Sequence, residues 1–126
     1  MTDPESDLTA RIAVIKQEFL SRLSYDWVPN LRDLRRRFVA APADTALLNQ
    51  MLHAAHDMTG SGAIFGYEEI SDHGRRLDGS LRQLIKNEVE DTPEYRKEIV
   101  DLIDQLERVC VAALSDLTTP DTPPRG

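Results

Sequence analysis

Apolar residues recur every three or four positions along most of this chain, which is the period of an amphipathic α-helix. The first stripe predicts a helix over about residues 7–24 and consists of Leu8, Ile12, Ile15, Phe19 and Leu23. Pro29 suits the first turn of a helix better than its interior, so we expect a second or kinked segment over about residues 28–39. This segment either continues the first helix or packs across an end of the molecule. Its inward side is expected to contain Trp27, Leu31, Leu34 and Phe38.

Longer helical stripes follow a break at residues 41–43. One helix begins near Asp44 or Thr45, either of which can cap exposed backbone amides, and runs to about Phe65, where Gly66 ends it. The next helix spans about residues 67–88, and Gly74 on its inward side permits close helix packing. We expect this helix to bury Ile70, Leu77, Leu81 and Leu84.

The last helix has Thr92 as its cap and Pro93 as its first residue, and it ends near Leu117. Its stripe is Ile99, Leu102, Ile103, Leu106, Cys110 and Ala113. No stretch of useful length alternates as a β-strand does. Amphipathic helices joined by short loops bury their stripes most simply against one another. We therefore predict an all-α fold, an antiparallel up-and-down four-helix bundle with an additional or kinked N-terminal helical segment.

Length and composition fit one globular domain. The chain has 126 residues, of which 40% are hydrophobic and 29% charged, and this length suffices for one core. We assign residues 1–117 to the domain. The proline-rich residues 118–126 lack an apolar period and are predicted to form a disordered tail.

Net charge and hydropathy exclude several classes of partner. The formal charge of −7 disfavours nucleic acid, which proteins bind by neutralising phosphates with Lys and Arg. The basic run at residues 32–37 is interleaved with apolar residues at helical spacing, which is more typical of a solvated helix face than of a docking patch. No apolar run approaches the length of a membrane span, and residues 1–5 lack the features of a signal peptide. We expect a cytoplasmic monomer that binds no membrane.

His56 lies opposite the apolar stripe of its helix. At about 100° per residue, the residues that fall within about 40° of the opposite side are Leu47, Met51, Ala54, Met58 and Phe65. The histidine therefore points outward, together with Asn49, Leu52, Gly60 and Ala63. A glycine inside a helix costs about 1 kcal/mol relative to alanine. Gly60, one turn after His56, thus indicates space kept for a bulky group such as a phosphoryl group and the partner that delivers it.

The order His56-x-x-x-Gly60, followed by small residues and by Phe65-Gly66 at the helix end, resembles the phosphorylation motif of histidine phosphotransfer (HPt) domains. It is also similar to the first domain of chemotaxis histidine kinases. The flanking helical pattern matches such a domain over about residues 6–117. The family commonly has lysine three residues after the histidine, and this chain has Thr59 there.

The resemblance implies that His56 exchanges a phosphoryl group with the aspartate of a response-regulator receiver domain. The implied partners are receiver domains, a hybrid histidine kinase, or both. A neutral imidazole, whose reference pKa is about 6.5, can attack phosphorus. The receiver would supply Mg²⁺, so the domain itself is expected to need no cofactor. The chain has no Gly-rich loop ending in Gly-Lys-Ser or Gly-Lys-Thr, and we predict a phosphoryl carrier rather than an autonomous kinase.

Thr59 brings no charge, although its hydroxyl can donate a hydrogen bond to a phosphoryl oxygen. A nearby cation can replace the family's lysine. If the turn at Gly66 is symmetric, residues ten positions on either side of it are level, and Arg75 and Arg76 occupy the level of His56. We favour Arg76 over Arg75, although both are equally explained as solvated surface residues.

The docking surface is expected to include Leu52 and Ala63 on the exposed side of the helix, with His53 as a neighbour of His56. A pair with the spacing His53-x-x-His56 can also hold a metal ion. However, no further Cys or carboxylate completes a ligand set by spacing, and we predict no metal site. His73 lies at the edge of an apolar stripe, where a structural role is favoured.

Two alternatives remain open. One is a bundle of the same fold that docks a receiver or a kinase without transferring phosphate, which the threonine at position 59 motivates. The other is an unrelated structural or metal-binding bundle, because helical periodicity alone fits many bundles.

Overall fold

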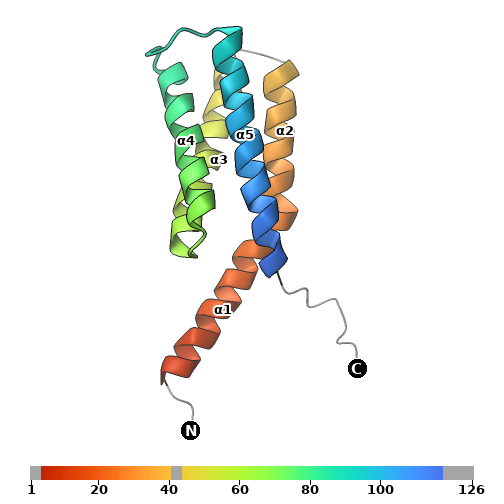
Figure 1. The fold of residues 1–126 in the computed structure, drawn as a ribbon, viewed down its shortest axis with the longest axis vertical. Helices are drawn as coiled ribbons and strands as arrows, with labels where there is room; N and C mark the ends of the chain where they lie inside the picture. The colour runs from red at the N-terminus through yellow and green to blue at the C-terminus, as the bar shows by residue number, and fades with distance from the viewer. Residues whose placement is uncertain (1–3, 41–43, 118–126) are drawn as a thin grey trace.

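The computed structural model describes residues 4–40 and 44–117. Its long helices are α1 (Pro4–Arg22), α2 (Val28–Ala40), α3 (Thr45–Ile64), α4 (Glu68–Ile85) and α5 (Pro93–Ala113). Helices α2 to α5 lie side by side with alternating directions, and α1 projects from one end of this bundle (Figure 1). No strand occurs in these ranges. The predicted all-α, up-and-down bundle is confirmed, whereas the predicted break at residues 41–43 and the tail at residues 118–126 lie outside the described residues.

The helix ends follow the capping residues of the sequence. Asp44 accepts a hydrogen bond from the Ala46 amide at the start of α3, and the Thr92 hydroxyl accepts one from the Tyr95 amide at the start of α5. Gly66, with φ of 82°, adopts the left-handed conformation that ends a helix. Helix α4 ends at Ile85, three residues earlier than predicted, and Asn87 takes a positive φ in the connection that follows. After α5 the chain continues as a short 3₁₀-helix, η2 (Leu114–Asp116).

Helices α1 and α2 are joined by η1 (Leu23–Trp27), a π-helical segment in which the Val28 amide donates to the Leu23 carbonyl five residues back. The predicted kinked segment is thus a continuation of the first helix. The helical stretch from Pro4 to Ala40 is nearly twice as long as α3, α4 or α5. It therefore extends well beyond the end of the bundle (Figure 1).

This overshoot corrects the prediction that the first stripe is buried. Leu8, Ile12 and Ile15 are 59%, 54% and 48% exposed, because they lie on the projecting part of α1. Only the end of the stripe, Phe19 and Leu23, reaches the core. The rest of the core comes from all four bundle helices, including Leu34, Met51, Met58, Leu77, Leu81, Ile99, Ile103 and Leu106.

Helices α3 and α4 approach each other closely at two glycines. A Cβ atom on Gly74 would lie 2.5 Å from the Thr59 hydroxyl and 3.1 Å from the Ala55 carbonyl oxygen. A Cβ atom on Gly62 would lie 2.8 Å from the Ser71 amide. Gly74 was expected to permit such packing, and Gly62 adds a second point of contact. Together these contacts hold α4 against the helix that carries His56.

Helices α2 and α5 are joined by ion pairs across their surfaces. The Arg32 guanidinium lies 2.7 Å from Glu107, and the Arg35 guanidinium lies 2.6 Å from Asp104. Because Asp104 accepts hydrogen bonds from Arg35, the pKa of that guanidinium is raised further. The basic run is thus a solvated face, as predicted, but two of its arginines also connect neighbouring helices.

Candidate functional site

His56 lies in the middle of α3 with 68% of its side chain exposed. Among the residues predicted to lie opposite it, Leu47, Met51 and Met58 are buried, and Ala54 and Phe65 are half-buried. On its own side of the helix, Asn49, Gly60 and Ala63 are exposed. The predicted helical phase holds for these residues, whereas Leu52, which was expected on the exposed side, is half-buried. The imidazole is exposed, as predicted.

Asp78 of α4 is the charged group beside the His56 ring. The Nδ1 atom of His56 lies 3.5 Å from Oδ2 of Asp78, whose side chain is only 13% exposed. The other carboxylate oxygen of Asp78 forms an ion pair with Arg82. A carboxylate next to Nδ1 favours the tautomer that carries its proton on that nitrogen. In that tautomer the lone pair resides on Nε2.

The expectation that Arg75 or Arg76 lies level with His56 is corrected by the α3–α4 register. Contacts between Gly62 and Ser71 and between Thr59 and Gly74 place the centre of the turn between residues 66 and 67. The residue level with His56 is therefore Leu77, one later than a count from Gly66 gives, and the next residue, Asp78, lies beside the ring.

The two arginines lie elsewhere on α4. Arg75 forms an ion pair with Asp72 at 3.1 Å. Arg76 is two residues, or about 200°, from Asp78 around the helix, so it faces away from α3. Arg82 forms an ion pair with Asp78. Among the contacts described, it is the cation that is linked to His56 through this shared carboxylate.

Thr59 does not direct its hydroxyl at the space beside His56. The hydroxyl donates a hydrogen bond to the Ala55 carbonyl oxygen at 2.7 Å, and the half-buried side chain lies against Gly74. This corrects the expectation that the Thr59 hydroxyl is available to a phosphoryl oxygen, because the threonine faces the α3–α4 contact.

Gly60 borders open space. A Cβ atom built there would meet no heavy atom within 4 Å, so no neighbouring group explains the glycine. The space lies one turn along α3 from His56. It is consistent with the predicted role of Gly60 in access, which stays a prediction.

The apolar surface near His56 differs from the one expected. Leu52 is half-buried and packs against the core, which leaves little of it for a partner. Ile64 at the end of α3 is 77% exposed and lies two turns from His56, about 80° around the helix. Sequence reasoning missed Ile64, although its position on the same helical projection could have identified it.

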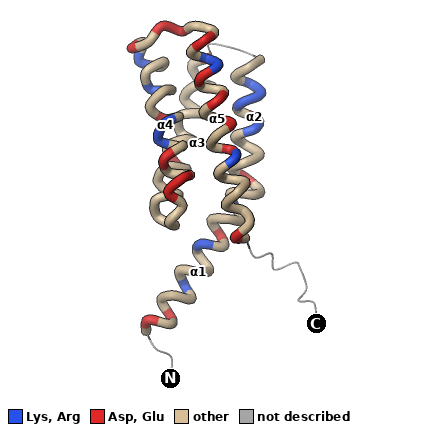
Figure 2. Tube along the Cα trace, viewed as in Figure 1, with Lys and Arg blue, Asp and Glu red and all other residues tan. Residues whose placement is uncertain are grey.

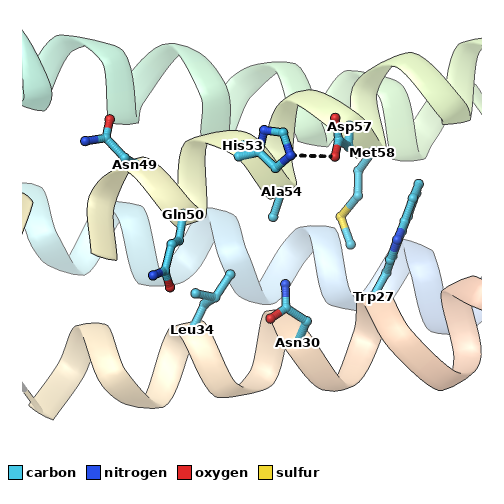
Figure 3. A pocket seen from close by; sticks show the side chains of 9 residues that line it. All are labelled: Trp27, Asn30, Leu34, Asn49, Gln50, His53, Ala54, Asp57 and Met58. Atoms are coloured by element: carbon cyan, nitrogen blue, oxygen red, sulfur yellow. Dashed lines mark ion pairs between the residues drawn. The ribbon is translucent and has the colours of Figure 1, made fainter. Parts of the chain in front are cut away.

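His53 lines a groove on the side of α3 that faces α2. Its side chain is 79% exposed, and Nε2 lies 3.2 Å from Asp57. The groove, between α3 and the start of α2, has a volume of about 450 Å³ and is lined on opposite sides by the residues drawn in Figure 3. Trp27, Asn30 and Leu34 face it from the α2 side. It offers both apolar surface and amide groups beside His53.

Other reactive groups of the chain are accounted for by packing. Burial raises the pKa of the Cys110 thiol to about 12, which keeps it protonated and unreactive. His73 is half-buried, and its Nδ1 atom is enclosed without a hydrogen-bond partner.

Within residues 4–40 and 44–117, no three His, Cys, Asp or Glu side chains gather as metal ligands would. None of the helices described has the length and apolarity needed to cross a bilayer.

A family model described as "Hpt domain" matches residues 7–109. The chain belongs to the Hpt domain family. Domains of this family take part in histidine phosphotransfer in two-component systems, and they interact with receiver domains and kinases. No curated protein and no solved structure matches the chain. In this Hpt domain, the match extends from the projecting part of α1 to the last turns of α5 and includes the whole of the His56 site.

Proposed function

We propose that this Hpt domain carries a phosphoryl group on Nε2 of His56 and relays it between the aspartates of receiver domains, including that of a hybrid kinase. The observation that supports the proposal most directly is the exposed His56 ring with its Nδ1 atom against Asp78. Exposure makes the ring accessible, and the carboxylate directs the lone pair to the outer nitrogen.

The proposed step is an in-line displacement. The Nε2 lone pair attacks the phosphorus of an aspartyl phosphate, the Nε2–P bond forms, and the P–O bond to the aspartate breaks to release the carboxylate. The proton on Nδ1 stays in place, and the positive charge that develops on the ring is balanced by Asp78. Transfer in the other direction reverses these bond changes. A receiver-bound Mg²⁺ would supply most of the stabilisation of the phosphoryl oxygens.

The surface around His56 would receive the receiver domain. Gly60 and Ala63 leave room over the ring, and Ile64 supplies an exposed apolar contact of the kind that marks an interface. His53 and its groove extend this surface on the α2 side. The bundle thereby supplies a nucleophile and a docking surface, while the partner supplies the remaining catalytic groups.

Transfer from a phosphorylated receiver tests the proposal. Wild type should acquire an acid-labile, base-stable label, and His56→Gln should acquire none. His53→Gln is the matched control, because it removes an exposed histidine of the same helix and should retain the label. A label on His56→Gln would contradict the assignment. Binding of the receiver without any label on wild type would favour the docking module that transfers nothing.

Asp78→Asn tests the role of the carboxylate. The amide keeps the shape of the side chain but loses its charge, so the preference for the proton on Nδ1 weakens. Transfer should slow several-fold, and the nitrogen chemical shifts of the His56 ring should report a larger share of the other tautomer. Unchanged shifts together with an unchanged rate would show that Asp78 does not set the tautomer.

A further inference from the structure

The projecting part of α1 carries an apolar face that nothing in residues 4–40 and 44–117 covers. Leu8, Ile12 and Ile15 are each about half exposed, and Ile15 lies nearest the bundle, where it lines a hollow together with Phe65. We infer that this face binds the same face of a second copy of the chain, with the two α1 helices antiparallel.

The spacing along this face is that of a two-helix seam. Leu8, Ile12 and Ile15 alternate in steps of four and three residues, and they fall within about 60° of one another around the helix. This is the narrow stripe found where two helices pair, rather than the wider face that packs on a bundle. Antiparallel pairing brings Ile12 of each copy opposite Ile15 of the other, so that the two isoleucine layers form the centre of the contact.

The charges beside the seam select the antiparallel direction. Arg11 and Glu18 lie seven residues apart on the same edge of α1, and both are exposed. In the antiparallel register, Arg11 of each copy lies beside Glu18 of the other, which gives two attractive pairs. A parallel register would instead bring Arg11 beside Lys16 of the second copy. Acidic residues lie at the N-terminal end of α1 and basic residues follow them along the helix (Figure 2), so charges of both signs are available for self-complementary pairing.

The present partner of Arg11 does not prevent this pairing. Arg11 lies 3.3 Å from Asp7 one turn earlier, and both side chains are more than half exposed. Exposed pairs of this type contribute little to stability. The guanidinium can therefore turn toward a second carboxylate at small cost.

A hollow marks the point where the end of the second α1 would lie. It has a volume of about 130 Å³, and its lining includes Ile15, Phe19 and Phe65. In the register that pairs Ile12 with Ile15, Leu8 of the second copy is level with Phe19, which is itself 5% exposed beneath Phe65, so Leu8 would enter the hollow beside Phe19 rather than cover it. The contact would then extend from the isoleucine layers to the aromatic cluster at the base of the bundle, where Phe19 stacks on Phe65.

The antiparallel arrangement separates the two bundles. Each bundle lies at the opposite end of the paired α1 helices, because α1 leaves its own bundle at one end (Figure 1). His56 lies nine residues before Phe65 on α3, about 14 Å along the helix, and so stays away from the seam. This proposed dimer differs from the monomer expected from sequence, an expectation that treated the α1 stripe as part of the core.

Sedimentation equilibrium of the full chain from micromolar to millimolar concentration tests the inference. Wild type should form a reversible dimer, and Ile12→Asp should remain monomeric with an unchanged helical circular dichroism spectrum. Arg11→Glu and Glu18→Arg should each weaken the dimer about tenfold, because each turns two attractive pairs into repulsive ones. The double variant Arg11→Glu/Glu18→Arg should restore it.

Lys97→Glu is the matched control, because it makes the same change in charge at the end of the bundle far from α1 and should leave the dimer unchanged. A wild type that stays monomeric up to millimolar concentration would overturn the inference. So would a dimer that survives Ile12→Asp. A dimer that Arg11→Glu strengthens would contradict the antiparallel direction, because this substitution relieves repulsion only in the parallel one.

Discussion

The accessibility of His56 and its preferred tautomer depend on different parts of the fold. Accessibility follows from the phase of α3, which directs the apolar stripe inward and the imidazole outward. The tautomer depends on Asp78 of α4, whose Oδ2 lies 3.5 Å from Nδ1. At the scale of one residue, the proposed mechanism therefore uses α3 to position the imidazole and α4 to set its tautomer.

Gly60 provides a prediction in which stability and activity change in opposite directions. Gly60→Ala should raise the free energy of unfolding by about 0.5–1 kcal/mol, because the added methyl group meets open space. Gly60→Glu should slow phosphotransfer at least about tenfold, since a bulky anion would obstruct an incoming phosphoryl group. Denaturant titration and receiver-transfer kinetics measure the two effects. Wild-type transfer by Gly60→Glu would remove the steric role of this glycine.

At the scale of the elements, the contact between α3 and α4 determines what lies beside the histidine. Gly62 and Gly74 allow the two backbones to approach, and this approach fixes the register that brings Asp78 to His56. Thr59 lies in the same contact, and its hydroxyl donates a hydrogen bond to the Ala55 carbonyl oxygen. The residue that replaces the family's lysine is thus part of the helix packing.

The start of α5 provides a pH-dependent prediction. The Arg96 guanidinium donates two hydrogen bonds to Asp91, at 2.6 and 2.7 Å, and thereby lowers the pKa of that carboxyl group. A lowered pKa stabilises the fold at pH values above the unfolded-state pKa of about 4, and this contribution is lost as the pH falls below it. Asp91→Asn should therefore lower the free energy of unfolding at pH 7, by less than about 1 kcal/mol because the Asp91 side chain is 41% exposed.

The difference in unfolding free energy between wild type and Asp91→Asn should disappear near pH 2, where both carry a neutral side chain. Urea denaturation across this range measures it. Glu90→Gln is the control, since Glu90 is exposed and has no ion pair within the described part of the chain. A difference that persists at low pH would show that the asparagine acts through packing instead.

At the scale of the whole molecule, exposed apolar residues gather in separate places. One is the end of α3, where Ile64 lies near His56, and another is the projecting part of α1. Acidic residues are prominent in the connection between α4 and α5 at the other end of the bundle (Figure 2). The surface proposed for phosphotransfer thus lies apart from the exposed apolar face of α1.

Ile64→Asp tests whether the surface at the end of α3 binds the receiver. The residue is 77% exposed, so the fold should tolerate the charge while receiver affinity falls about tenfold, as for an apolar interface residue. Val39→Asp is matched, because Val39 is a β-branched residue, 60% exposed, near the end of another helix. Calorimetric titration with the receiver compares the two. Equal affinities for both variants would place the docking surface elsewhere.

Much of the fold could be predicted because helical periodicity reports which side of each helix is apolar. The stripe opposite His56 and the capping residues Asp44, Thr92 and Gly66 sufficed to place α3 and α5. Periodicity does not report what covers an apolar side, and for this reason Leu8, Ile12 and Ile15 were assigned to the core. The partner of His56 was missed for a different reason. A shift of half a residue in the centre of a turn moves the level position by one residue and so changes the facing side chain by about 100°, and the sequence does not locate that centre.

The π-helical segment η1 adjusts the phase between α1 and α2. If residues 4–40 formed one regular α-helix, the apolar face of α1 and the buried face of α2 would point about 100° apart. A π turn holds about one residue more than an α turn, and the Val28 to Leu23 hydrogen bond marks that turn here. The extra residue cancels the offset, so the two faces align. Deleting one residue from Leu23–Trp27 would restore the regular helix and rotate the α1 face by about a quarter turn. The direction in which α1 presents its apolar face to a partner therefore depends on this short segment.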